Sequence, residues 1–489
     1  MPNFVPVSRK PIDFRADITR VILKPFVPSS EERIRKIIDR VLSLSEDTVE
    51  QWLDRVIGEF AHRHNHFQKV LQENYQRVAH YIPKGKKLSD KRKTLIGAYF
   101  THEYSVEAAA LFNPSIVPHP NQRDLPAGHE RFILSLRATG EAPHISLHLN
   151  HRGGGVLDAQ NEVSMETPTP FLLPGEVQPL RTPALDFLRA ALEASSLPKG
   201  ILKQVLQANG KPASVDSVRK ALQHQTRVHP ELRALLPDML EQLDRAERES
   251  FALTYANDVP VSERIIFPVS SEERNGIEDA RFVQFTDDNG DVVYYAPYTA
   301  YDGKQINMKL LQTKDFLHFE VYPLFGQAIR NKGMALFPEK INGKYAAISR
   351  QDGESLFLMY SDSLFRWEEA EVIRIPELPW EVVQIGNCGS PIKTEEGWLL
   401  LTHGVGPLRK YVIGVYLLDL HDPSKIIGAL DEPILSPNEK EREGYVPNVV
   451  YSCGGMVRQN ELILPYAYSD VGTGIATIPL PQLLRALQA

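Results

Sequence analysis

Apolar residues recur at helical spacing in the first part of the chain, between residues 29 and 76. A first stripe, spaced three or four residues apart as one face of an α-helix requires, consists of Ile34, Ile37, Ile38, Val41 and Leu42. The segment Ser29-Ser30-Glu31-Glu32 before it is typical of a helix N-terminus. A second stripe consists of Trp52, Val56, Ile57, Phe60 and Ala61. We expect both faces to pack in a helical cap or an oligomer contact rather than to form a ligand site.

Helical spacing returns between residues 183 and 248. One face carries Leu188, Ala191 and Leu192, and a later one carries Leu236, Met239, Leu240 and Leu243. Strand-like periodicity lies on both sides of this segment, at 131–137 before it and from Ile265 onward after it. The pattern predicts a helical insertion within a β-rich protein.

From Ile265 onward a unit of about 45–60 residues repeats, in which a turn of Gly, Asn or Asp joins a strand to a strongly apolar strand. Such units lie at 280–298, 335–349, 390–402 and 448–466, and residues 110–136 follow the same template, which makes five. A small antiparallel sheet cannot bury its own faces, so the repeat predicts a five-bladed β-propeller and favours it over a β-sandwich.

The predicted fold is therefore mainly β, with two helical additions. We expect an N-terminal helical region at 1–100, a first blade segment at 101–182, a helical insertion between the first and second blades at 183–260, and the remaining blades with the catalytic centre at 261–489.

The composition excludes several classes of protein. Hydrophobic residues make up 42% and charged residues 24% of the 489 residues, as in ordinary globular chains. A net charge of −7 provides no basic field for nucleic acid or a membrane surface. Two cysteines, Cys388 and Cys453, are too few for a disulfide framework or a zinc cage, and we expect buried thiols. No signal-peptide core and no apolar run of spanning length is present, which favours a cytoplasmic enzyme or binding protein.

In a propeller the first strand of each blade lines the central axis, so polar residues at equivalent positions of the repeats converge on one pocket. These positions carry Asn113, Arg137, Glu278, Asp279, Arg281, Lys332, Arg350, Lys393, His403, Tyr445, Asn448 and Asp470. Carboxylates and amides pair with sugar hydroxyls, whereas arginine and lysine bind phosphate. The set predicts a site for a polyol and a charged co-substrate.

Ten short motifs follow one another along the chain. They read Phe112-Asn-Pro-Ser, Gly276-Ile-Glu-Asp-Ala-Arg, Tyr298-Thr-Ala-Tyr, Leu336-Phe-Pro-Glu-Lys-Ile-Asn-Gly-Lys-Tyr, Ser349-Arg350, Pro391-Ile-Lys-Thr, Thr402-His-Gly-Val, Leu417-Leu-Asp-Leu, Tyr445-Val-Pro-Asn-Val-Val and Ser469-Asp470. In this order the chain resembles glycoside hydrolase family 130, over about residues 111–158 and 265–479. The resemblance implies a five-bladed propeller that phosphorolyses or hydrolyses β-mannosides with inversion.

The resemblance implies that Asp279 is the general acid and passes its proton to the glycosidic oxygen through the mannose 3-hydroxyl. We expect burial and the neighbouring Glu278 to raise the pKa of Asp279. The residues implied in sugar binding are Asn113, Arg137, Glu278, Arg281, Tyr445, Asn448 and Asp470. Asn113 and Asn448 could instead be turn residues, and Arg281 could instead form an ion pair with Glu278 or Asp279.

Phosphorolysis needs cations in place of a second carboxylate, because phosphate is itself the nucleophile. The family's phosphorylases bind it with two arginines and a lysine, and here Arg350 matches the second arginine and Lys393 the lysine. Lys332 stands at the first arginine's position, which keeps the charge but loses the bidentate fork. The resemblance also implies that His403 belongs to the phosphate site, but His403 could instead be a buried histidine of the core.

The sequence thus favours inverting phosphorolysis of a β-mannoside, with β-1,2-linked mannobiose or manno-oligosaccharide as the expected substrate. Inorganic phosphate is the co-substrate, α-mannose 1-phosphate the product, and no metal or organic cofactor is expected. Two alternatives stay open: an inverting β-mannosidase with Glu278 or Glu339 as base, and a non-catalytic glycan-binding propeller.

Two features depart from the family pattern. Ala280 replaces the usual proline of the acid motif, which should relax the backbone without removing the acid. The helical regions are absent from compact members, and we expect them to wall the acceptor side of the site or to form a homo-oligomer contact.

Overall fold

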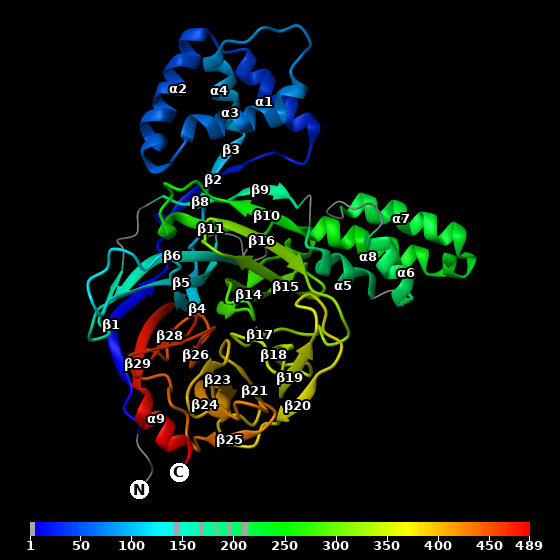
Figure 1. Cartoon of the computed structure of the whole chain (residues 1–489). Coiled ribbons are helices and arrows are strands. Elements are labelled where there is room, and N and C mark those ends of the chain that lie inside the picture. The colour runs from blue at the N-terminus through cyan, green and yellow to red at the C-terminus, as the bar shows by residue number, and fades with distance from the viewer. Residues whose placement is uncertain (1–4, 141–146, 166–170, 181–182, 194–196, 208–213) are drawn as a thin grey trace.

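The computed structural model describes residues 5–140, 147–165, 171–180, 183–193, 197–207 and 214–489. Most of these residues form a body of β-strands that carries two groups of helices. Figure 1 shows the N-terminal helices above this body and a second group of helices at its side. The mainly β class predicted from the sequence is confirmed, and so are the N-terminal helices.

The β body contains, within the described residues, five sheets of four to seven strands. The first has the order β4 (Ala110–Pro118), β5 (Glu130–Thr139), β6 (Leu147–Leu157), β11 (Arg264–Ile266) and β8 (Leu173–Pro174), with β7 (Val163–Met165) beside β6. The second has the order β12 (Ile277–Glu278), β14 (Val292–Tyr301), β15 (Ile306–Thr313), β16 (His318–Pro323), β10 (Phe251–Thr254) and β9 (Glu176–Pro179), with β13 (Val283–Thr286) beside β14. Neighbouring strands are antiparallel, except that β8 runs parallel to β11.

The third and fourth sheets follow in chain order. The third consists of β17 (Ala335–Leu336), β18 (Tyr345–Ser349), β19 (Leu356–Ser361) and β20 (Glu371–Arg374). The fourth consists of β21 (Gln384–Asn387), β23 (Trp398–Val405), β24 (Tyr411–Leu418) and β25 (Ile426–Ala429), with β22 (Ile392–Lys393) beside β23. Each contains the predicted hairpin of a short strand and an apolar strand, and in the fourth sheet the apolar strand β23 is buried throughout whereas β22 is not.

The last sheet joins the two ends of the chain. Its order is β26 (Val450–Tyr451), β28 (Glu461–Tyr468), β29 (Gly472–Pro479) and β1 (Ser8–Arg15), with β27 (Met456–Arg458) beside β28. Helix α9 (Leu480–Leu487) packs against this sheet. The sequence had predicted a helical region at 1–100. Strand β1 belongs to the last sheet instead, so this region contains strands as well as helices.

The N-terminal helices form a separate small core. They are α1 (Glu31–Leu42), α2 (Glu46–Phe60), η1 (Ala61–Arg63), α3 (Phe67–Val78), η2 (Ala79–Tyr81) and α4 (Asp90–Tyr99), and the paired strands β2 (Val21–Pro25) and β3 (Thr101–Ser105) connect them to the β body. The stripe predicted for α1 is buried at Ile34, Ile38 and Val41. The stripe predicted for α2 is not buried as a whole, because the helix packs through Val49 and Leu53 and leaves Trp52 exposed.

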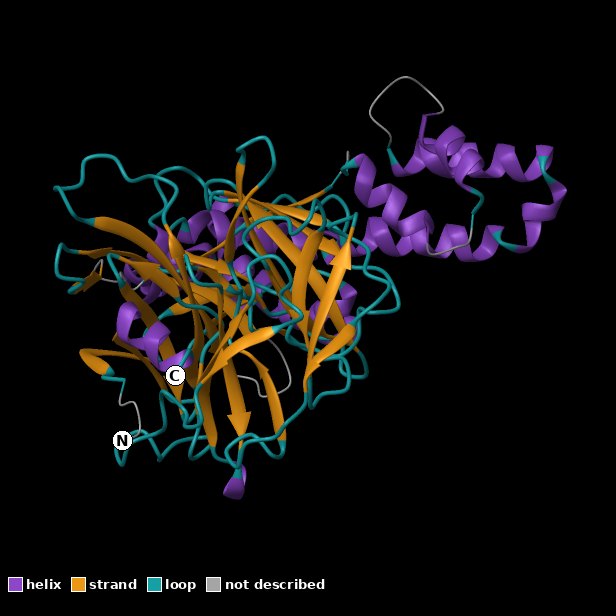
Figure 2. Ribbon diagram, turned by 60° about the horizontal axis from the view of Figure 1, so that its bottom comes forward, coloured by secondary structure: helices purple, strands orange, loops and turns teal. Residues whose placement is uncertain are grey.

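The insertion consists of α5 (Leu185–Glu193), α6 (Lys199–Gln207), α7 (Val215–Val228), η3 (Pro230–Ala234) and α8 (Leu236–Glu249). Figure 2 shows its helices extending to one side of the strands. Phe187 on α5 contacts the rings of Tyr322, Phe325 and Phe365, which anchors the insertion on the second and third sheets. Strands β9 and β10 flank it and belong to the second sheet, so its helices end before the predicted boundary at residue 260.

Three short helical turns lie in the connections of the β body: η4 (Val261–Glu263), η5 (Ser271–Glu273) and η6 (Pro407–Arg409). Cys388 and Cys453 are buried free thiols, as predicted. Among the described residues, no helix is both long enough and apolar enough to cross a membrane.

Candidate active site

All five sheets contribute to one polar cavity of about 170 Å³. Its lining residues are Asn113, Arg137, Glu278, Asp279, Arg281, Lys332, Gly333, Arg350, Gln384, His403, Arg409, Tyr411, Val446, Val449, Tyr451 and Asp470. Nine of the twelve residues predicted from the sequence are among them. Residues up to 357 positions apart in the chain, from Asn113 to Asp470, therefore meet in one cavity.

Besides Arg409 (φ 54°), three of the polar lining residues have left-handed backbones. Asn113 (φ 51°) lies at a bulge where β4 loses its register with β5, Asp279 (φ 54°) follows β12, and Asp470 (φ 52°) lies between β28 and β29. Outside glycine this conformation is uncommon, and it concentrates at functional sites where the surrounding structure holds it in place. The local backbone turns these three side chains into the cavity.

Asp279 is 8% exposed and is held by two donors. Its Oδ1 accepts a hydrogen bond from Asn113 Nδ2 at 2.7 Å and lies 3.2 Å from Arg137 Nη1. Burial favours the neutral acid, but the charges of Arg137 and Arg281, the Asn113 hydrogen bond and Lys332 outweigh it and lower the pKa of Asp279. The sequence had predicted that this pKa is raised. That prediction is wrong, because the sequence did not show how many cations surround the carboxylate.

Glu278 is bonded by two cations. Arg137 Nη2 lies 3.2 Å from its Oε1, and Lys332 Nζ lies 3.2 Å from its Oε2. The guanidinium of Arg137 also stacks over the ring of Phe112 at 4.9 Å. A carboxylate with both oxygens engaged in this way is poorly placed to activate water.

Arg281 supports the backbone of the acid motif from below the cavity. It is 2% exposed and donates to the carbonyl oxygen of Asp279 at 3.0 Å, to Asn387 Oδ1 at 3.1 Å and to the Tyr451 hydroxyl at 2.6 Å. Its contact with Asp279 goes to the main chain rather than to the carboxylate. The structure thus places it as a brace between the second, fourth and fifth sheets.

His403 is buried and neutral. Burial, together with the charges of Arg350 and Arg281, holds its pKa well below the usual value. Nδ1 lies 3.2 Å from the carbonyl oxygen of Asn387 and so carries the proton, which leaves Nε2 to accept a hydrogen bond from Arg350 Nη1 at 3.2 Å. Among the described residues, Arg350 has no carboxylate within ion-pair distance, and its buried Nε has no hydrogen-bond partner.

The pKa of Asp470 is shifted in the opposite direction to that of Asp279. Burial raises its pKa to about 6, and the charge of Arg137 offsets only part of this because Asp279 adds a like charge nearby. The cavity therefore holds one carboxyl group that changes its charge near neutral pH and one that does so well below it.

Three predicted residues lie elsewhere. Lys393 is bonded to Glu339 at 2.5 Å and pairs with Trp398 on the neighbouring strand β23. Trp398 lies five residues before His403 on this strand, and at about 3.3 Å per residue the two are on the order of 16 Å apart. Tyr445 is 81% exposed. Asn448 has a φ of 63° and accepts a hydrogen bond from Arg442 Nε, so the turn explanation holds for it. Lys393 lies near the opposite end of its hairpin from His403, whereas Tyr445 and Asn448 lie in the connection before β26, on either side of the lining residue Val446.

Four further polar residues of the cavity were not predicted: Gln384, Arg409, Tyr411 and Tyr451. Arg409 lies in the turn between β23 and β24, at the same end of the hairpin as His403, so the turn Gly406-Pro407-Leu408-Arg409 was a usable signal. Gln384 Nε2 lies 3.4 Å from His403 Nε2. No periodicity marks Gln384, because its strand has only four residues.

The model of a protein family described as beta-1,4-mannooligosaccharide phosphorylase, glycoside hydrolase family 130, matches residues 213–489, more than half of the chain. The chain belongs to glycoside hydrolase family 130. The sequence had predicted this membership, and with it an enzyme, and both are confirmed.

This family 130 enzyme is similar to several β-mannoside phosphorylases. A 1,2-beta-oligomannan phosphorylase of Thermoanaerobacter sp. (strain X514) is 36% identical over 44% of this chain and 72% of its own length. A beta-1,2-mannobiose phosphorylase of the same organism is 37% identical over 42% of this chain and 68% of its own length. The structure of a Listeria innocua beta-1,2-mannobiose phosphorylase bound to beta-1,2-mannobiose covers 79% of this chain and 93% of its own, at 22% identity and a TM-score of 0.46.

Proposed function

We propose that this family 130 enzyme phosphorolyses β-1,2-linked manno-oligosaccharides or mannobiose with inversion and releases α-mannose 1-phosphate. The linkage rests on the two Thermoanaerobacter relatives, whose names specify β-1,2 substrates. The reaction type rests on the cavity itself, where Arg350, which has no carboxylate partner in the described part of the chain, lies together with the buried Asp279.

The charges of the cavity favour phosphate over water as the nucleophile. Five cationic side chains line it, against three carboxylates: Arg137, Arg281, Lys332, Arg350 and Arg409 against Glu278, Asp279 and Asp470. Glu278 is already paired with Arg137 and Lys332. Arg350 is bonded to a neutral histidine, so its charge is available to a dianion. Arg350 carries this proposal, with His403, Lys332 and Arg409 as its neighbours.

Buried polar atoms without partners support a ligand at this place. Among the described residues of the cavity, Asn113 Oδ1, Arg137 Nε and Arg350 Nε are buried and have no hydrogen-bond partner. Leaving such atoms unpaired costs about 1–3 kcal/mol each, which a hydroxyl-rich sugar and phosphate would recover. We propose that Asn113, Arg137, Glu278 and Asp470 bind the mannosyl unit and that Arg281 holds the acid motif in place.

In the proposed reaction Asp279 protonates the glycosidic oxygen through the mannose 3-hydroxyl, the C1–O bond breaks, and a phosphate oxygen bonds C1 from the opposite face. A carboxyl group with a lowered pKa is ionised at neutral pH, so Asp279 must gain a proton before it acts as the acid. A phosphate dianion raises the pKa of a nearby carboxyl, and the proton of hydrogen phosphate balances the one given to the departing sugar.

We further propose that the five sheets close into a five-bladed propeller around the cavity. Every sheet, or a segment beside it, supplies a lining residue, and β1 ties the N-terminal end of the chain to β29. Inorganic phosphate would be the co-substrate, and the reaction would need no metal or organic cofactor. The enzyme would act in the cytoplasm, where a sugar phosphate can be used directly. The two helical groups would wall the acceptor side or join copies of the chain.

Incubation with β-1,2-mannobiose, with and without phosphate, tests the proposal. We expect α-mannose 1-phosphate, detected by ³¹P and ¹H NMR, only when phosphate is present. Free mannose formed without phosphate would instead establish a β-mannosidase, and no turnover of any β-mannoside would leave a glycan-binding protein.

A further inference from the structure

A cluster of charged side chains is buried outside the cavity, where the insertion meets the second sheet. Glu249, Glu273, Lys309 and Tyr298, here called the buried ion cluster, are each at most 3% exposed. Glu249 is the last residue of α8, Glu273 ends η5, and Tyr298 and Lys309 pair with each other across β14 and β15. Charges this deep persist only when each has partners.

Lys309 connects the end of the insertion to the turn that follows it. Its Nζ lies 3.2 Å from Glu249 Oε2, 3.2 Å from the Glu249 carbonyl oxygen and 3.4 Å from Glu273 Oε1, and it also donates to the Ser270 hydroxyl. One ammonium group thus binds the C-terminus of α8 and both ends of the 270–273 turn. Loss of this cation would leave two buried carboxylates facing one another.

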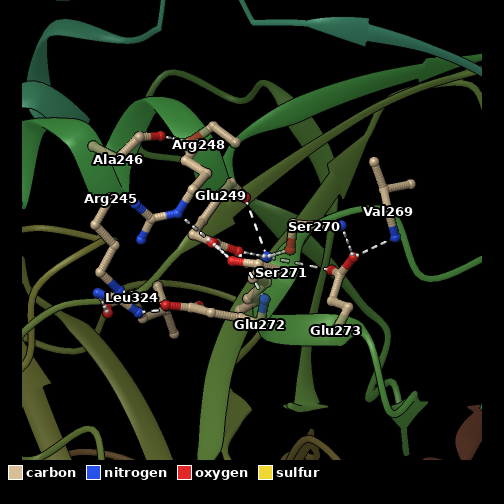
Figure 3. Close-up of polar contacts among 12 residues, drawn as sticks. Arg245, Ala246, Arg248, Glu249, Val269, Ser270, Ser271, Glu272, Glu273 and Leu324 are labelled. Atoms are coloured by element: carbon tan, nitrogen blue, oxygen red, sulfur yellow. Dashed lines mark hydrogen bonds and ion pairs between the residues drawn. The ribbon is translucent and has the colours of Figure 1, made fainter.

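The carboxylates in turn hold the main chain of the turn, as Figure 3 shows. Glu249 accepts from the Ser271 hydroxyl at 2.5 Å and from the Glu272 amide at 3.2 Å. Glu273 accepts from the amides of Val269 and Ser270 at 2.8 and 3.0 Å, and from the Tyr298 hydroxyl. The turn is therefore bound from the helix on one side and from the sheet on the other.

The turn leads directly into the acid motif. The Gly276 amide donates to the Glu273 carbonyl oxygen at 2.7 Å, and three residues later comes Asp279. Glu278 pairs with Thr299 on β14, the residue after Tyr298. The buried ion cluster thus fixes both the segment before the motif and the strand opposite it.

We propose that Glu249, Lys309 and Glu273 are positioning residues that hold the 276–279 segment, and with it the carboxyl group of Asp279, so that α8 of the insertion determines the geometry of the acid. The inference rests on the proposed role of Asp279. It gives the insertion a task in catalysis that is separate from walling the acceptor side.

The test compares Lys309→Met with Lys309→Arg, Glu249→Gln and Arg219→Ala. Arg219→Ala is the matched control, because Arg219 joins α7 to Asp244 and Glu247 of α8 by exposed ion pairs without touching the cluster. A misplaced acid lowers kcat by about 10- to 100-fold. We expect this loss of kcat for Lys309→Met and Glu249→Gln, with the KM for mannobiose within about threefold of the wild-type value. Lys309→Arg should recover the wild-type kcat, and the control Arg219→Ala should leave kcat unchanged. A folded Lys309→Met protein with the kcat of the wild type would overturn the proposal.

Hydrogen exchange provides a readout that needs no activity. The amides of Gly276 and Arg281 are bonded to the carbonyl oxygens of Glu273 and Pro297, so loosening of the motif should speed their exchange by about tenfold or more. We expect this in Lys309→Met, or in Glu249→Gln if the former does not fold, with the amides of β23 unchanged. Unchanged exchange at 275–281 would overturn the inference. Failure of the wild type to cleave β-mannosides would overturn the proposed function and leave this measurement valid.

Discussion

Replacing Arg350 by alanine removes a cavity cation that, among the described residues, has no carboxylate within ion-pair distance. Its guanidinium contacts the neutral His403 at 3.2 Å, and its Nε is buried without a partner among the described residues. A hydrogen bond to a charged group contributes about 1.5–3 kcal/mol, and a guanidinium can form two with one phosphate. A loss of about 3 kcal/mol corresponds to a rise of more than about 100-fold in the phosphate KM.

The assay is the initial rate of α-mannose 1-phosphate formation from saturating β-1,2-mannobiose while phosphate is varied. Lys393→Ala is the matched control, since Lys393 is bonded to Glu339 away from the cavity and should leave the phosphate KM unchanged. A phosphate KM for Arg350→Ala within about threefold of the wild type would refute the reasoning. An equal effect of Lys393→Ala would show that the phosphate lies elsewhere.

Three further changes test other parts of the site. Asp279→Asn should lower kcat by at least about 10³-fold while the protein stays folded, and near-normal turnover would contradict its role as acid. Asp470→Asn should stabilise the protein at pH 7 by up to about 3 kcal/mol, because the pKa of Asp470 is raised from 3.8 to about 6 in the folded state. The folded carboxyl binds its proton more tightly than the unfolded one, so this gain should vanish as the pH falls from 6 to 4 in urea unfolding, and a constant gain would contradict it. Arg281→Met should reduce the free energy of unfolding by about 3 kcal/mol or more, since it removes the donor to the Asp279 carbonyl oxygen and the Tyr451 hydroxyl and leaves Asn387 Oδ1 with the Gly389 amide alone, and wild-type stability would show that Arg281 is not a brace.

The secondary structure followed from local patterns wherever those patterns reflect burial. The stripe of α1 was predicted because helical spacing marks its one buried face, and strands β18, β23 and β28 because continuous apolar runs reflect burial on both faces. The buried face of α2 was misplaced, since apolar residues lie on two of its sides and only the packing partner decides which side is covered. Strand β1 was missed, because its pairing with β29 spans almost the whole chain.

The candidate site was predictable in its members more than in its chemistry. Ordered motifs and equivalent positions of the repeat located nine of the cavity residues, although these lie on different sheets. Lys393 and Tyr445 are not among the lining residues, because a position next to a motif does not determine the direction in which a side chain points. The pKa of Asp279 was predicted in the wrong direction, since it depends on distances to Arg137 and Arg281 that only the fold sets.

The sequence by itself determined the family, the mainly β class, the helical additions and the identity of the acid motif, because each of these is written in local order or periodicity. Only the tertiary structure decided which cations surround Asp279, that Arg409 and Gln384 line the cavity while Lys393 does not, and that Glu249 and Lys309 connect the insertion to the motif. The physical reason is that electrostatic interactions and hydrogen bonds depend on distances across the fold, which spacing along the chain does not fix.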